Sequence, residues 1–144
     1  AGGIASGEAM LAAMALGAEG IQAGTLFALT EESSASEEFK KRCTELAEGD
    51  TMLCLKKIAP TRLIKNALYT KLAEAEDKGA TADELREILG RAASKRGIFE
   101  GDMESGELEI GQIASAIKTI KPVSEVMKEL ISGFEKAKER VALL

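Results

Sequence analysis

The stretch AGGIASGEAMLAAMALGAEGIQAGTLFALT, residues 1–30, decides the fold of this 144-residue chain. Two short segments of small and apolar residues, 1–4 and 20–24, each precede apolar residues at helical spacing. We therefore expect the end of a strand, a helix between Ser6 as N-cap and Gly17 as stop, a second strand, and the start of another helix. Strands that alternate with helices predict an α/β fold with parallel strands.

The rest of the chain has mainly helical patterns. They predict helices over residues 37–48, 67–78, 81–95, 110–120 and from 122 onward, with N-caps at Ser36 and Thr81. Residues 50–57 read as a short strand, 62–66 as irregular chain and 97–109 as an acidic loop. Because two strands do not form a stable sheet alone, we expect residues 1–35 to be the last β/α units of a larger sheet. Residues 36–144 would be a mostly helical extension packed on it, and the two glycines at the start strengthen the expectation of a missing N-terminal part.

The overall charge and composition exclude several classes of protein. The 19 Lys and Arg residues against 24 Asp and Glu give a net charge of −5, which argues against a nucleic-acid partner, since phosphate binding needs a positive surface. Uncharged stretches fall far short of the ~20 residues that span a bilayer, so we expect no membrane partner. Cys43 and Cys54 do not make a disulfide framework and fit a cytoplasmic protein.

The chain contains no histidine. Its own residues therefore cannot supply an imidazole base, a Ser/His/Asp triad or a histidine-ligated metal. The acidic residues between 100 and 109 lack the spacing of an EF-hand calcium loop, so we expect a solvated loop and no metal site.

Glycines stand at both points where an expected strand gives way to a helix, at Gly2, Gly3 and Gly24. Missing side chains let a ligand approach the backbone closely, and free N–H groups at a helix start attract anions. In a (β/α)₈ barrel a phosphate commonly binds between the loops that follow strands seven and eight. Tight turns without a ligand are the simpler interpretation of the spacing alone, and both interpretations stay open.

Longer motifs extend this pattern through most of the chain. They are AGGIASG at 1–7, AAMALGAEGIQAGT at 12–25, TEES at 30–33, IKN at 64–66, EGD at 100–102 and GQIA at 111–114, with Phe27 and Arg62. The set resembles the C-terminal part of the nitronate monooxygenase (2-nitropropane dioxygenase) family, which includes the FMN-dependent enoyl-ACP reductase II. The resemblance is densest in residues 1–33.

This resemblance implies an FMN-containing TIM barrel with an added helical region. Residues 1–35 would hold the end of strand seven, helix seven and strand eight, and residues 36–144 the extension. It assigns the FMN phosphate site to six residues, Gly2, Gly3, Gln22, Ala23, Gly24 and Thr25. Leu26 stands where the family usually has Arg, which puts a charge from that position in doubt. Gln112, near the active-site mouth in the family, is a weaker substrate-proximal candidate or an ordinary residue of a helix start.

The resemblance also implies an oxidoreductase. The first interpretation is a nitronate monooxygenase that oxidises alkyl nitronates with O₂, and the alternative is an enoyl-ACP reductase that uses NAD(P)H. A non-catalytic helical interaction module is an alternative of another class.

The family's catalytic histidine lies on an earlier strand, so we expect no catalytic residue in this chain and no activity from it alone. Expected partners are a small-molecule nitronate or enoyl-thioester substrate and the missing N-terminal barrel portion, with a homodimer left open. Arg62, Lys65 and Asn66 are open to two interpretations, contact with an anionic substrate or ordinary surface.

Overall fold

The computed structural model of the chain describes residues 1–143. Its helices are α1 (Gly7–Ala15), α2 (Gly24–Ala28), α3 (Glu37–Thr44), α4 (Ala67–Asp77), α5 (Ala82–Leu89) and α6 (Val123–Val141). A π-helical turn η1 (Lys95–Phe99) and a 3₁₀ turn η2 (Gln112–Ala116) complete the helical elements. The strands β1 (Thr51–Cys54) and β2 (Thr61–Ile64) form an antiparallel hairpin.

Local capping explains where several helices begin. The Ser6 hydroxyl accepts the N–H of Ala9, and Ser36 does the same for Phe39, both at 3.2 Å. Thr81 forms a reciprocal capping box at the start of α5. Such caps satisfy backbone donors that have no partner inside the helix. The N-caps predicted from the sequence are therefore confirmed.

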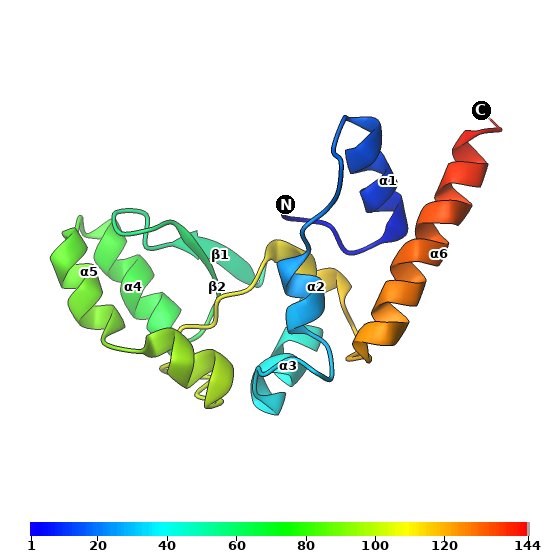
Figure 1. Cartoon of the computed structure of the whole chain (residues 1–144). Coiled ribbons are helices and arrows are strands. Elements are labelled where there is room, and N and C mark those ends of the chain that lie inside the picture. Colours follow the sequence, from blue (N-terminus) through cyan, green and yellow to red (C-terminus); the bar gives the residue numbers. More distant parts are fainter. Residues whose placement is uncertain (144) are drawn as a thin grey trace.

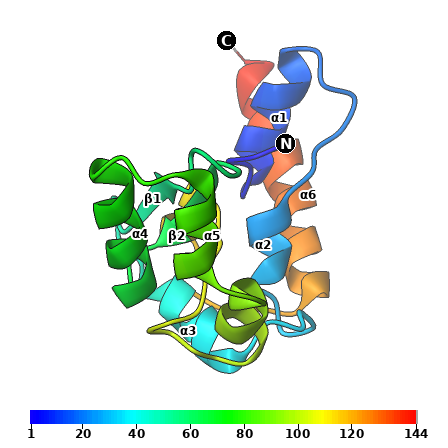
Figure 2. The same ribbon diagram turned by 90° about the vertical axis from the view of Figure 1, so that its left-hand side faces the viewer.

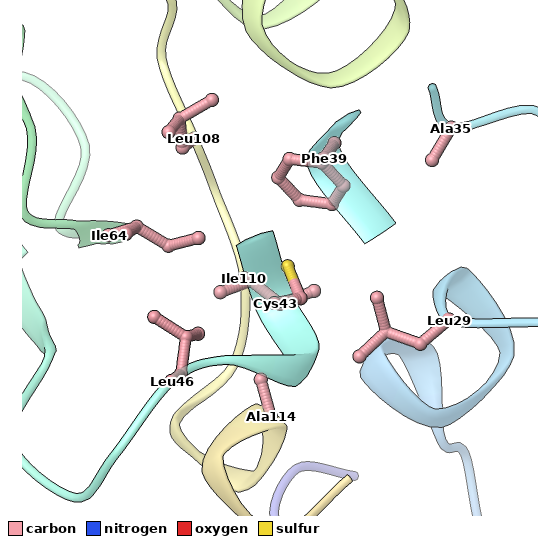
Figure 3. Close-up of a cluster of buried hydrophobic side chains, with 9 residues drawn as sticks. All are labelled: Leu29, Ala35, Phe39, Cys43, Leu46, Ile64, Leu108, Ile110 and Ala114. Carbon is pink, nitrogen blue, oxygen red and sulfur yellow. The ribbon is translucent and has the colours of Figure 1, made fainter. Parts of the chain in front are cut away.

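The β1–β2 hairpin lies between two groups of helices (Figures 1 and 2). Helices α4 and α5 cover one side, with Cys54 and Leu63 buried against them. The other side faces α2 and α3, where Ile64 belongs to a second core cluster. Figure 3 shows that cluster, which consists of Leu29, Ala35, Phe39, Cys43, Leu46, Ile64, Leu108, Ile110 and Ala114. Because side chains alternate along a strand, one short hairpin supports both cores.

The second edge of β2 pairs with the segment 108–110. Ile64 donates its N–H to the Leu108 carbonyl at 2.9 Å, and Ile110 donates to the Arg62 carbonyl at 3.2 Å. Leu108 and Ile110 thereby point into the same core as Ile64 (Figure 3). This contact ties the chain that follows η1 to the hairpin.

Helices α1 and α6 pack against each other at the far side of the molecule (Figure 1). Their closest approach is at two glycines, since a Cβ built on Gly7 would lie 2.0 Å from the Phe134 nitrogen. A Cβ built on Gly133 would lie 3.4 Å from the Gly7 Cα. Only a residue without a side chain fits at position 7.

The start of α6 is joined to the chain that follows α2. Glu31 donates its N–H to the Lys121 carbonyl at 3.1 Å, beside a parallel bridge between Thr30 and Lys121. The Glu32 carboxylate accepts the Val123 N–H with both oxygens, at 2.9 and 3.0 Å. A carboxylate at a helix N-terminus also interacts favourably with the helix dipole. We call this junction the neck, residues 30–32 with 121–123.

The two parallel strands expected in the first 30 residues are absent from the described part of the chain. Residues 1–4 and 20–23 have no regular secondary structure and no ladder partner among residues 1–143, and Gly24 already belongs to α2. A strand persists only when a neighbour accepts its backbone hydrogen bonds. The helix expected between these segments is present as α1, and Gly17 beyond its C-cap has a φ of 101°.

Other boundaries also differ from the sequence prediction. Residues 62–66, expected to be irregular, contain most of β2, because both edges of that segment find partners. The helix expected over 110–120 shrinks to η2, because Ile110 is paired with Arg62 and stays extended. The helix expected over 81–95 ends at Gly90, whose φ of 71° stops α5, and part of the expected loop is the turn η1.

The close approach at Gly7 yields a stability prediction. Gly7→Ala places a Cβ inside the backbone of α6. Overpacking costs roughly 1–3 kcal/mol, and we expect the free energy of unfolding to decrease by an amount near the upper end of that range. Gly20→Ala is the matched control, since its Cβ meets nothing within 4 Å and its φ is not positive. Urea unfolding followed by circular dichroism measures both, and equal midpoints for the two variants would contradict the packing.

Candidate functional site

The glycines of the predicted phosphate site leave the backbone open. Gly2 and Gly3 have φ values of 86° and 72°, which side-chain-bearing residues rarely adopt. A Cβ built on Gly2, Gly3 or Gly24 would meet no atom within 4 Å. Figures 1 and 2 both place the N-terminal end of the chain beside the N-terminal end of α2. The two glycine segments are therefore brought together in space.

The N-terminal end of α2 has no side-chain cap. Ala23 occupies the N-cap position and offers no hydrogen-bonding side chain, so the first-turn N–H groups at Gly24 and Thr25 lack a capping partner within the described chain. Ala23 is buried and Gln22 exposed, so only the Gln22 side chain reaches solvent. An anion could approach these N–H groups without meeting a side chain at Gly24.

Thr25 connects this end of α2 to the GQIA motif. Its hydroxyl oxygen accepts the Gly111 N–H at 3.1 Å, although the two residues are 86 positions apart. A Cβ built on Gly111 would lie 2.5 Å from that oxygen, so glycine is needed for the contact. Gln112 follows as the exposed first residue of η2. The structure thus brings the Gln112 backbone close to the predicted phosphate site.

A cavity of about 410 Å³ opens between α2, β2 and the segment 109–111. Its lining includes Gly24, Thr25, Ala28, Arg62, Glu109 and Gly111. Arg62 and Glu109 are its charged residues. The sequence alone left Arg62 between two interpretations, because no periodic pattern relates it to Gly24.

The neighbours of Arg62 have different roles. Asn66 is a structural residue: its side chain accepts the Tyr69 N–H at the start of α4 and donates to the carbonyls of Met103 and Gly106. Lys65 is exposed and does not line the cavity. Of the three residues weighed for an anionic substrate, only Arg62 is in the cavity.

The acidic segment 100–109 forms hydrogen bonds within itself. Asp102 accepts the N–H groups of Ser105 at 2.8 Å and Glu104 at 3.1 Å, and these bonds lower the pKa of its carboxyl group. Glu107 is buried and accepts the Ser94 hydroxyl at 2.5 Å. Among residues 1–143 no group of three or more Cys, Asp or Glu side chains is arranged to hold a metal ion.

The sequence of this chain is similar to that of several known proteins. A family model described as nitronate monooxygenase matches residues 1–133. A probable nitronate monooxygenase of Staphylococcus aureus is 31% identical over 136 residues, which are 92% of this chain and 37% of that protein. The chain belongs to the nitronate monooxygenase family. A probable nitronate monooxygenase of Staphylococcus saprophyticus is 35% identical over 101 residues, 67% of this chain and 28% of that protein.

Solved structures agree with this family. FabK from Thermotoga maritima superimposes with a TM-score of 0.89 and 32% identity, over 98% of this chain and 45% of that one. Nitroalkane oxidase from Streptomyces ansochromogenes gives a TM-score of 0.73 and 28% identity, over 99% of this chain and 40% of that one. These neighbours are TIM-barrel oxidoreductases, and the α/β structure described above is consistent with a fragment of one.

The chain spans well under half the length of the curated relatives it matches, 28% and 37% in the two cases above. Among the described residues, no helix combines the length and apolar character that crossing a bilayer requires.

The two thiols are buried away from the cavity, which leads to a reactivity prediction. Burial raises the pKa of Cys43 to about 12 and that of Cys54 to about 11. At pH 8 a thiol with a pKa near 11 is ionised in only about one molecule in a thousand, and the thiolate is the reactive form. We expect neither thiol to react with Ellman's reagent at pH 8 until the chain is unfolded in guanidinium. Rapid labelling of the folded chain would contradict their burial.

Proposed function

We propose that this chain supplies the phosphate-binding end of the cofactor site in an FMN-dependent oxidoreductase. The observation that carries the proposal is the open backbone at Gly3 and Gly24, in the two segments that resemble the family's phosphate-binding motifs. Family membership and the TIM-barrel oxidoreductase neighbours support it. Free FMN phosphate is a dianion, and open N–H groups at a helix start suit such a group.

The barrel assignment is part of the proposal. Residues 1–35 would be the end of strand seven, helix seven as α1, and strand eight, while residues 36–144 form the extension that packs on the barrel. The remaining strands would come from an N-terminal barrel portion, which is the first partner of this chain. In that setting residues 1–4 and 20–24 would gain the neighbouring strands that they lack within the described chain.

Backbone N–H groups would provide most of the contacts to the FMN phosphate. The N–H groups of Gly3, Gly24 and Thr25 would hold phosphate oxygens, and Gly2 would let the phosphate approach the backbone. The Thr25 hydroxyl already accepts the Gly111 N–H, which leaves its own hydrogen free to donate. Leu26 is buried and contributes no charge, so backbone donors carry the binding.

When bound, FMN supplies the electron-transfer chemistry, while the protein binds and orients it. The substrate would enter at the cavity next to Thr25, beside Gln112, whose backbone follows the Gly111 N–H bonded to the Thr25 hydroxyl. The chain has no histidine, so the imidazole expected to act on the substrate would come from the N-terminal barrel portion. This chain alone should therefore be inactive.

Two substrate classes fit this site. The curated relatives favour alkyl nitronates oxidised with O₂. The similarity to FabK favours the second candidate, an enoyl-ACP reductase that uses NAD(P)H on an enoyl thioester. A cytoplasmic location is also proposed, and the two buried thiols, which are not paired with each other, support it.

An activity comparison tests the reaction class. The full-length flavoprotein should oxidise propionate 3-nitronate with O₂ uptake, and should do so faster than it reduces crotonyl thioester with NADH. Faster turnover of the crotonyl thioester would replace the first candidate with the second. A full-length protein that stays colourless after addition of FMN and acts on neither substrate would refute both and favour a non-catalytic helical module.

Glycine substitutions test the phosphate site. Gly24→Ala adds a Cβ that meets nothing in the protein, so a loss of FMN affinity reports on the ligand itself. Gly24→Val and Gly3→Val should each weaken FMN binding in the full-length protein more than tenfold, since tenfold is only about 1.4 kcal/mol. Thr25→Val should cost less, because it removes one hydroxyl and keeps the shape. Flavin fluorescence during titration of each apoprotein gives the affinities.

The matched control addresses backbone strain. Gly49 has a φ of 90°, like Gly3 at 72°, but it lies between α3 and β1 and does not line the cavity beside α2. Gly49→Ala should lower stability without changing FMN affinity. Parent-like FMN binding by both folded valine variants would place the phosphate elsewhere.

A further inference from the structure

Arg62 lines the cavity beside Thr25. Its Nη1 donates to the Thr51 carbonyl at 3.1 Å and to the Thr51 hydroxyl at 3.4 Å. Arginine has five N–H donors, and within the described chain no partner is found for those on Nε and Nη2. The bond to Thr51 orients the group and leaves one edge unused.

The unused edge is accessible to solvent. The described residues include no fully buried side-chain nitrogen or oxygen that lacks a hydrogen-bond partner, so the unpaired Nε and Nη2 each keep some contact with solvent. Arg62 as a whole is only half-buried. No carboxylate of residues 1–143 lies within 4.0 Å of its guanidinium nitrogens. An external oxyanion could therefore pair with it side-on.

The register of the hairpin shows that Arg62 lies on the same face as Ile64. Arg62 pairs with Leu53, and Ile64 pairs with Thr51, so these four side chains share one face of the hairpin. Ile64 packs in the core with α2 and α3, and Arg62 lies two residues nearer the open end of that face. Thr25 and Gly111 line the same cavity as Arg62, and Gly111 follows Ile110, which donates its N–H to the Arg62 carbonyl.

We propose that Arg62 is a substrate-binding residue that pairs with an oxyanion group of the substrate. The proposal rests on the function proposed above, in which the same cavity lies next to the FMN phosphate site. A nitronate group and a phosphate group of a nicotinamide nucleotide share this chemistry, since each presents two oxygens to the planar guanidinium fork. Arg62 is the cation of the cavity lining, in a chain whose net charge is −5.

Kinetics of the FMN-loaded full-length enzyme test this role. Arg62→Gln should raise the KM for the anionic substrate by about tenfold to a hundredfold, the range expected when a hydrogen bond to a charged group is lost. The affinity for FMN should stay within twofold of the parent. A raised KM for propionate 3-nitronate identifies the nitronate as the oxyanion, and a raised KM for NADH identifies the nucleotide phosphate.

Matched variants separate recognition from folding. Arg62→Lys keeps the charge, so it should raise KM less than Arg62→Gln and retain the parent's thermal unfolding midpoint. Lys65→Gln removes a cation three residues away that does not line the cavity, and its KM should match the parent. Glu109→Gln removes the negative charge from the lining and should lower KM severalfold.

A direct titration distinguishes failure of this proposal from failure of the proposed function. Inorganic phosphate, added to the full-length protein in a calorimeter, needs no turnover and should bind the parent at least tenfold more tightly than Arg62→Gln. A parent protein that neither binds FMN nor turns over either substrate refutes the proposed function. The phosphate titration still tests Arg62 in that case, because it requires no turnover. Equal phosphate affinity and equal KM values in the parent, Arg62→Gln and Arg62→Lys overturn the role of Arg62.

Discussion

The backbone pairing between β2 and the segment 108–110 is the contact on which the rest of the structure depends. It satisfies the second edge of β2, which would otherwise expose unpaired donors and acceptors. It also aligns Leu108 and Ile110 with Ile64 in the core around α3 (Figure 3). Each such bond contributes only about 1 kcal/mol net, but leaving a buried partner unpaired costs more. One residue beyond the pairing, Gly111 meets Thr25, so the cavity wall is a continuation of this edge.

Much of the helical structure could be predicted from the sequence because its signals are local. Ser36 and Thr81 cap helices within three residues of themselves, and the stop at Gly17 needs only a positive φ. The strand β2 was missed because its partners lie elsewhere in the chain, and its four residues carry no distinctive alternation. The predicted strands at 1–4 and 20–24 failed for the opposite reason, since a correct local pattern had no neighbouring strand to pair with.

Some residues of the candidate site could be found from the sequence, and others could be located only in the structure. The glycines were found because missing side chains are visible in a sequence, and the structure gives Gly3 and Gly24 the open backbone that such a role requires. The contact between Thr25 and Gly111 links residues 86 positions apart, and no spacing rule could have revealed it. Arg62 was noticed as a charge but not located, because only the hairpin register shows which face it occupies.

The neck carries a consequence for how such a chain can change. The polypeptide departs for the hairpin at Glu32 and returns at Val123, and these two points are bonded to each other. The chain between Glu32 and Val123 therefore begins and ends at the same junction. Its length does not affect the distance between α2 and α6. Because the entropy of closing a loop grows only slowly with its length, residues can be gained or lost there at little thermodynamic cost. Related chains can therefore differ in length between residues 33 and 122 while the junction of residues 30–32 with 121–123 stays in position.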